Sequence, residues 1–208
     1  MATRMKIVTP EFRLSFPAVW EPKAGPDGGE EKYRIVMLFP KTEDIKALKK
    51  LAYDAIAEKW GADKGKWPAN LRNLDLGKFL STSGKDGWPF RDGDAQSLDG
   101  YAGCVSVSAT SKQAPGVVDR KLKPIIDKDE LYAGCYCRAS VTAFAYDKAG
   151  NKGVSFGLQN IQKIRDGESF SGRSRAEDDF DAIAGDDDTA SWDDPGNYDD
   201  SKSDEMFA

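Results

Sequence analysis

The chain has 208 residues, 39% hydrophobic side chains and a formal net charge of −5, which fits one core with room for an unpacked segment. It contains no histidine and three cysteines, which excludes Ser-His or Cys-His catalysis and favours a reducing compartment. Its longest apolar run, Ile35–Phe39, is far below the roughly 18 residues of a membrane helix, and no apolar signal core follows Met1, so neither a membrane span nor secretion is expected.

The first part of the chain predicts two strands and a helix. Met5–Phe16 and Lys32–Phe39 have strand character, and the proline- and glycine-rich stretch between them, from Pro17 to Gly29, reads as a loop. Thr42 is the expected N-cap of a helix that ends at Gly61. Apolar residues recur at helical spacing between these two positions, namely Ile45, Leu48, Ala52, Ala55, Ile56 and Trp60.

The middle of the chain is irregular, and three further strands follow it. Tryptophan, proline and glycine break any periodicity across 62–99, where only a short helix near Asn70–Asp75 is expected. Strands are predicted over Tyr101–Ser111, Cys135–Tyr146 and Gly153–Ile164, with a hairpin turn joining the last two. Five strands with one helix between the second and third predict a mostly β domain, a five-stranded barrel of the OB type.

The C-terminal segment differs from the rest in charge. Residues 176–208 hold thirteen carboxylates and one base, a net charge of −12, whereas residues 1–175 hold 29 bases and 22 acids, a net charge of +7. We therefore expect a domain over 1–175 and a disordered acidic tail over 176–208. A basic body favours a polyanionic ligand.

Aromatic residues stand among the tail carboxylates, where a purely solubilising tail needs none. Carboxylates imitate phosphates and rings imitate bases, so the tail is expected to regulate the body by occupying its nucleic-acid site, or to dock on a partner's basic patch. The alternative is a solubilising tail. The residues expected to act in this way are Asp186, Asp187, Asp188, Trp192, Asp193, Asp194, Tyr198, Asp199, Asp200, Asp204, Glu205 and Phe207.

The strand over 135–146 carries the most specific pattern. One face is small and apolar, as a barrel interior requires (Cys135, Cys137, Ala139, Val141, Ala143, Ala145). The other face is unusual for a solvated surface, because it carries three aromatics, one arginine and two hydroxyls (Tyr136, Arg138, Ser140, Thr142, Phe144, Tyr146). Rings stack on any base and arginine pairs with phosphate. The competing interpretation is a face covered by the 62–99 segment.

Further residues complete the candidate DNA site. Basic side chains in the 111–133 connector and after the last strand would contact phosphates (Lys112, Arg120, Lys121, Lys123, Lys163, Arg165). Trp88 and Tyr101 are additional candidates for stacking. Arg91 opens the motif Arg91-Asp92-Gly93-Asp94, which is either a structural turn or a lip of the DNA site.

Several apparent motifs carry no chemistry. The stretch from Gly61 to Trp67 is one residue short of a phosphate loop and lacks its Ser or Thr. Asp92-Gly-Asp94 lacks the continuation of a calcium loop. Cys135 and Cys137 are expected to fill the core, so no metal and no cofactor are predicted.

Four segments together resemble a phage family of single-stranded DNA-binding proteins with an OB fold. They are Trp88–Asp94, Tyr101-Ala-Gly, Gly134–Val141 and Gly153–Gly167, and the resemblance covers roughly residues 1–170. The acidic end, Glu205-Met-Phe-Ala208, is similar to that of the replicative single-stranded DNA-binding proteins of T7-like phages, although here Ala208 follows the aromatic residue. The resemblance implies a tail that restrains DNA binding and recruits partners.

These observations lead to one expectation and two alternatives. We expect a sequence-tolerant single-stranded DNA-binding protein without catalytic activity. The resemblance implies a role in phage replication or recombination in the cytoplasm of an infected bacterium, with replication proteins of phage or host as further partners through the tail. Monomer and homodimer both remain open. The first alternative is a DNA-mimic protein whose acidic aromatic tail inhibits or recruits a host nucleic-acid enzyme, and the weaker second one is a carboxylate-based nuclease.

Overall fold

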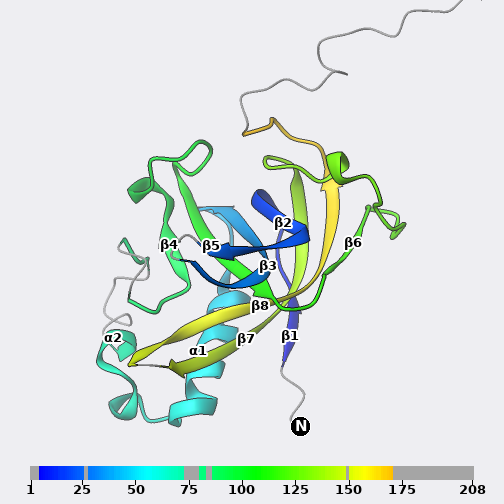
Figure 1. Cartoon of the computed structure of the whole chain (residues 1–208). Coiled ribbons are helices and arrows are strands. Elements are labelled where there is room, and N and C mark those ends of the chain that lie inside the picture. The colour runs from blue at the N-terminus through cyan, green and yellow to red at the C-terminus, as the bar shows by residue number, and fades with distance from the viewer. Residues whose placement is uncertain (1–4, 26–27, 73–79, 83–85, 149, 171–208) are drawn as a thin grey trace, which may run out of the picture. The chain divides into compact units, whose positions relative to one another are not determined.

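The structure, a computed structural model, describes residues 5–25, 28–72, 80–82, 86–148 and 150–170. Strands are the main secondary structure of the described residues (Figure 1). The elements in chain order are β1 Lys6–Val8, β2 Phe12–Gly25, β3 Gly28–Pro40, α1 Lys46–Trp60, η1 Lys64–Lys66, α2 Ala69–Arg72, β4 Phe90–Asp92, η3 Gly93–Ala95, β5 Cys104–Ser111, β6 Gly116–Val118, η4 Lys128–Glu130, β7 Tyr136–Lys148 and β8 Asn151–Arg165. The predicted tail over 176–208 lies outside the described residues.

Five strands close into a ring in the order β2-β3-β5-β8-β7, because β7 pairs with both β8 and β2. All pairs in the ring are antiparallel except β5 with β8. The predicted five-stranded barrel of the OB type is thus confirmed, and so is a helix, α1, between its second and third strands. Two of the additional strands, β4 and β6, are three residues each and lie in stretches for which the sequence predicted no strand.

The first barrel strand differs from its prediction at both ends. Pro10 interrupts it, and Thr9 bridges the break by donating its N–H to Ala139 O (2.9 Å) and accepting Ala139 N–H at Oγ1 (3.1 Å). The predicted loop from Pro17 to Gly29 is wrong, because β2 continues to Gly25 and β3 starts at Gly28. The β2–β3 pairing shifts register between Ser15 and Ala18 and again between Ala18 and Lys23. The prolines at 17 and 22 fall in these irregular stretches, where a strand tolerates a missing N–H.

Helix α1 begins four residues after the predicted N-cap. Glu43 N–H donates to Pro40 O (2.9 Å), so that Thr42 lies in a turn that leaves β3 rather than at the helix start. Asp44 Oδ1 instead accepts the N–H of Lys46 (3.0 Å). The predicted end at Gly61 is confirmed, since this residue takes a φ of 90° and donates to Ala57 O.

The inward face of β7 agrees with the prediction. Cys135, Cys137, Ala139, Val141 and Ala143 are all buried and belong to one hydrophobic cluster with the buried face of α1. Because alanine is small, the helix comes close to the β7–β8 hairpin, and Figure 1 shows α1 behind these two strands. The other side of the hairpin is therefore not covered by α1.

The segment predicted to be irregular contributes buried side chains to the core, among them Trp67, Leu71 and Phe90. The short helix expected near 70–75 corresponds to α2, and residues 73–79 lie outside the described ranges. Strand β4 pairs with β5 through Phe90↔Val107 to Asp92↔Val105. Within the described ranges, every helix is too short or too polar to span a bilayer.

Candidate nucleic-acid interface

The outward side chains of β7 alternate with the buried ones as predicted, since Arg138 is exposed and Tyr136, Phe144 and Tyr146 are partly exposed. They do not form a single site, however. Ten residues separate Tyr136 from Tyr146, which is about 33 Å of strand. The predicted residues around them fall into three groups along this length.

The first group lies where β7 and β8 form their hairpin. Phe144 is opposite Ser155, and Tyr146 is opposite Gly153. A Cβ built on Gly153 would collide with the Tyr146 hydroxyl, and one built on Gly157 would lie 4.0 Å from Phe144 Cε1. Gly153 therefore makes room for the Tyr146 hydroxyl, and Gly157 lies beside the Phe144 ring.

Small side chains continue this surface across the next strands. Val36 is opposite Ser108, and Thr110 is opposite Gly157. We call this surface the small-residue face; its members, all partly exposed, are Val36, Ser108, Thr110, Ser155 and Gly157. The small side chains of this face, beside Phe144 and Tyr146, would leave a base room to approach the rings.

Arg91 supplies a cation beside this face. It is exposed and lies opposite Ser106, on β4. Burial raises the pKa of the Tyr146 phenol, and the positive charge of Arg91 opposes that shift. The guanidinium is thus close enough to influence the ring electrostatically.

The remainder of the Arg91-Asp92-Gly93-Asp94 motif is a structural turn. Lys41 Nζ lies 2.7 Å from Asp92 Oδ1 and 2.6 Å from Asp94 Oδ2. Asp94 Oδ1 also accepts the N–H of Gly103 (2.6 Å). The turn therefore connects the end of β3 to the start of β5. This arrangement fixes the backbone next to Arg91.

The second group surrounds Arg138. Arg138 Nη2 donates to Gln162 Oε1 (3.1 Å), and Gln162 Nε2 donates to Asp119 O (3.3 Å). Asp119 Oδ1 accepts the N–H groups of Lys121 (2.7 Å) and Lys123 (2.8 Å), which makes a tight hairpin tip after β6. The tip brings together three exposed, positively charged side chains beside Arg138: Arg120, Lys121 and Lys123.

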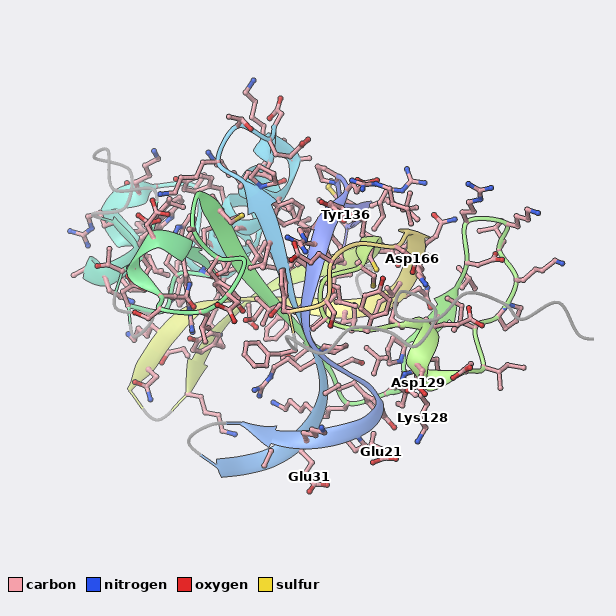
Figure 2. All side chains as sticks on the ribbon, turned by 90° about the horizontal axis from the view of Figure 1, so that it is seen from above. Glu21, Glu31, Lys128, Asp129, Tyr136 and Asp166 are labelled. Carbon is pink, nitrogen blue, oxygen red and sulfur yellow. The ribbon has the colours of Figure 1, made fainter. Side chains whose placement is uncertain are left out.

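The third group is at the other end of β7, around Tyr136. The guanidinium carbon of Arg165 lies 3.3 Å from the centre of the Tyr136 ring, and that of Arg13 lies 5.6 Å away. Arg165 is also paired with Glu11 (2.8 Å). Figure 2 shows Tyr136 and Asp166 together, well separated from Glu21 and Glu31 on the β2–β3 hairpin. The Tyr136 ring is thus already occupied within the protein.

Two further residues that were predicted to contact phosphates are, like Arg165, paired with carboxylates. Lys163 Nζ lies 2.8 Å from Asp166 Oδ1, and its side chain is 13% exposed. Lys112 Nζ lies 2.5 Å from Glu30 Oε1 and remains exposed. Neither lysine belongs to the hairpin tip or to the small-residue face.

Trp88 and Tyr101 require a correction, because the structure places both in the core, at 3% and 2% exposure. Trp88 packs on Tyr53 and Phe90, with ring centres 5.6 and 5.3 Å apart. The Tyr101 hydroxyl donates to Ser15 Oγ (3.2 Å). Trp88 stands in an irregular stretch without a period from which burial could be read. Tyr101, in contrast, shares the alternating face of Val105 and Val107, which are also buried, so the pattern already favoured its burial.

Three residues of interest escaped the sequence analysis. Phe16 is 57% exposed with a φ of 46°, Arg13 lies beside Tyr136, and Arg34 is opposite Thr110. A proline directly after Phe16 is a signal for a bulge in a strand. Arg13 was within a predicted strand but was not assigned to a face.

The thiols of Cys135 and Cys137 are 3.6 Å apart and fully buried. The hydrogen bond between them and burial raise the pKa of Cys137, which keeps this thiol protonated. Both act as core residues, as expected. Across the described ranges, acidic and cysteine side chains form no group of three that could hold a metal ion. The predicted regulatory residues of the tail lie outside the described residues.

Comparison with known proteins gives consistent matches. The family model described as "Enterobacter phage Enc34, ssDNA-binding protein" matches residues 5–190. Protein p50 of Acyrthosiphon pisum secondary endosymbiont phage 1 is 38% identical over 173 residues, which cover 81% of this chain and 88% of that protein.

Among solved structures, the bacteriophage Enc34 single-stranded DNA-binding protein in complex with ssDNA has a TM-score of 0.61 and 23% identity, covering 79% of this chain and 89% of that one. The single-stranded DNA-binding protein gp2.5 of bacteriophage T7 has a TM-score of 0.50 and 14% identity, covering 85% and 93%. At these identities the structural matches establish a shared fold.

Proposed function

The chain belongs to the family of the Enterobacter phage Enc34 single-stranded DNA-binding protein, and from this premise we propose that it binds single-stranded DNA without sequence preference. Every base has a π-face, so stacking on protein rings is tolerant of sequence. The proposal includes a role in phage replication or recombination in the cytoplasm of the infected bacterium, without catalysis.

The observation that supports this proposal most is the small-residue face with Phe144 and Tyr146 at its border. These rings lie beside glycines of β8 and remain partly exposed on the side that α1 does not cover. Bases would stack on them, and the exposed Arg91 would meet a phosphate. Each stacked base contributes about 1–3 kcal/mol.

Cations further along β7 extend the proposed path. Arg138 and the hairpin tip with Arg120, Lys121 and Lys123 would follow the backbone of the strand leaving the rings. Arg138 is about 26 Å from Tyr146 along β7, a distance that calls for several nucleotides. Lys112, Lys163 and Arg165 would contribute less, because each is paired with a carboxylate. Trp88 and Tyr101 are not part of this path, since both side chains are buried.

We further propose that the acidic tail competes for the same surface and recruits replication proteins. The tail has a net charge of −12 and residues 1–175 have a net charge of +7. The two opposite charges attract each other, and salt screens this attraction. Free DNA then has to displace the tail, and cutting the chain after Arg175 should tighten DNA binding, most strongly at low salt.

Fluorescence anisotropy of labelled oligo-dT tests the proposal, with the full chain and residues 1–175 titrated at several salt concentrations. We expect tight, salt-sensitive binding that strengthens on truncation. Weaker binding after truncation would contradict competition by the tail. If neither protein bound the oligonucleotide, single-strand binding would be wrong, and the tail acting as a DNA mimic on a partner would become the leading hypothesis.

A further inference from the structure

Phe16 combines two features that are unfavourable for an aromatic residue. Its φ is 46°, and among the described residues other than glycine only Leu122, with a φ of 64°, shares a positive value. Its side chain is also 57% exposed. A bulky residue rarely occupies the left-handed region, and such outliers concentrate at functional positions.

The left-handed backbone is what turns this ring out of the core. The β2–β3 register passes from Ser15↔Val36 to Ala18↔Arg34, so that Phe16 and Pro17 together oppose a single residue, Ile35. Ile35 is fully buried, and in a regular strand the opposing side chain would share its inward side. The bulge therefore gives Phe16 a solvent-facing position that alternation would deny it.

The exposed ring lies beside the small-residue face. Ala18 is opposite Arg34, which is opposite Thr110, which is in turn opposite Gly157. Phe16 thus borders the face on the β2 side, whereas Phe144 borders it on the β7 side. The two rings lie on different strands, β2 and β7, and are therefore separate stacking positions at the two borders of the face.

We propose that Phe16 is a base-stacking residue, held out of the core by the β2 bulge, so that the small-residue face receives unpaired bases of one DNA strand at both of its borders. This inference rests on the proposed function, which it deepens by adding a second stacking position. The ring is then retained at a strained position because of what it binds, since glycine would fit the backbone better.

Three variants of the full chain test the proposal with labelled oligo-dT: Phe16→Gly, Phe16→Leu and Phe16→Trp. Loss of one stacked base should weaken binding by about 5- to 150-fold in the first two variants, and Phe16→Trp should retain affinity. The slope of log Kd against log salt should not change, because no phosphate contact is lost. Thermal unfolding should show Phe16→Gly at or above the wild-type Tm, since glycine relieves the positive φ.

Two control variants separate stacking from other effects. Leu122→Gly relieves the other positive φ and should raise the Tm in the same way. Leu98→Ala removes an exposed apolar side chain that is not a member of the small-residue face, and it should leave Kd unchanged. The proposal is wrong if wild type binds the oligonucleotide and both Phe16→Leu and Phe16→Gly bind it with the same affinity as wild type. It is also wrong if Phe16→Gly lowers the Tm, because Phe16 would then be a packing residue. Absence of binding by wild type would instead refute the proposed function itself.

Discussion

The guanidinium carbon of Arg165 lies 3.3 Å from the centre of the Tyr136 ring, on directly paired positions of β8 and β7. Arg13 approaches the same ring from β2 at 5.6 Å, and a Cβ on Gly167 would lie only 2.8 Å from it. Tyr136 therefore joins three strands to the segment after β8. Tyr136 is thus a structural bridge, whereas Phe144 and Tyr146, which point outward from the same strand, are partly exposed.

Tyr136→Leu is expected to lower stability more than DNA affinity. Cation–π pairs at exposed sites contribute about 0.5–1 kcal/mol each, so the loss of two together with the packing should cost about 1–2 kcal/mol. Phe144→Leu should show the opposite pattern. Urea unfolding and oligo-dT titration of both variants provide the comparison, and equal effects of the two substitutions on affinity would contradict the distinction.

Replacing both Phe144 and Tyr146 by alanine should weaken single-stranded DNA binding strongly, by about 1–3 kcal/mol for each ring. The salt dependence should stay the same, because neither residue is charged. Tyr146→Phe keeps the ring and is the matched control. Anisotropy titrations at several salt concentrations measure both quantities, and undiminished binding by the double variant would remove these rings from the DNA path.

The hairpin tip should act through charge alone. Lys121→Gln and Lys123→Gln keep the backbone N–H groups that bind Asp119, and each should reduce the salt slope of DNA binding by about one. Lys128→Gln, at a lysine paired with Glu21 at 2.9 Å, is the control and should leave the slope unchanged. The same slope in all variants would place the DNA elsewhere.

Gly93→Ala should destabilise the turn behind Arg91. A Cβ at this position would lie 2.6 Å from Cys104 O and still closer to Tyr101 O, and both are backbone atoms that have little freedom to move. We expect a loss of about 2–4 kcal/mol in the free energy of unfolding. Gly103→Ala, where nothing lies within 4 Å but φ is 71°, should cost about 1–2 kcal/mol. Chemical denaturation that ranks them in reverse would refute this account.

The Lys41–Asp94 pair gives the turn an acid dependence. The Lys41 ammonium, followed by the Gly103 N–H, holds the pKa of Asp94 below its ordinary value of 3.8. A carboxyl group with a lowered pKa in the folded state stabilises the protein above its ordinary pKa, and this contribution is lost as pH falls through the lower folded value. Tm should therefore drop below about pH 4, and less so in Asp94→Asn. Parallel melting curves at pH 3, 4 and 7 measure the difference.

The barrel, its helix and the two faces of β7 could all be predicted from the amino-acid sequence. Strand alternation has a period of two, and the pattern from Cys135 to Tyr146 therefore separates core from surface without any knowledge of neighbours. The family resemblance reached the same fold from four short segments. The first residue of α1 could not be predicted, because several polar residues before Lys46 suit an N-cap equally well.

The exposure of the outward residues, in contrast, depends on contacts between distant parts of the chain. Trp88 and Tyr101 are buried because distant segments pack on them, whereas the bulge opposite Ile35 turns Phe16 outward. Lys112 and Lys163 find acidic partners through pairings between strands and in the segment after β8. Local periodicity sets the direction in which a side chain points. Its exposure and its charge partner depend on contacts with distant parts of the chain, and these contacts cannot be predicted from the local pattern of a single sequence.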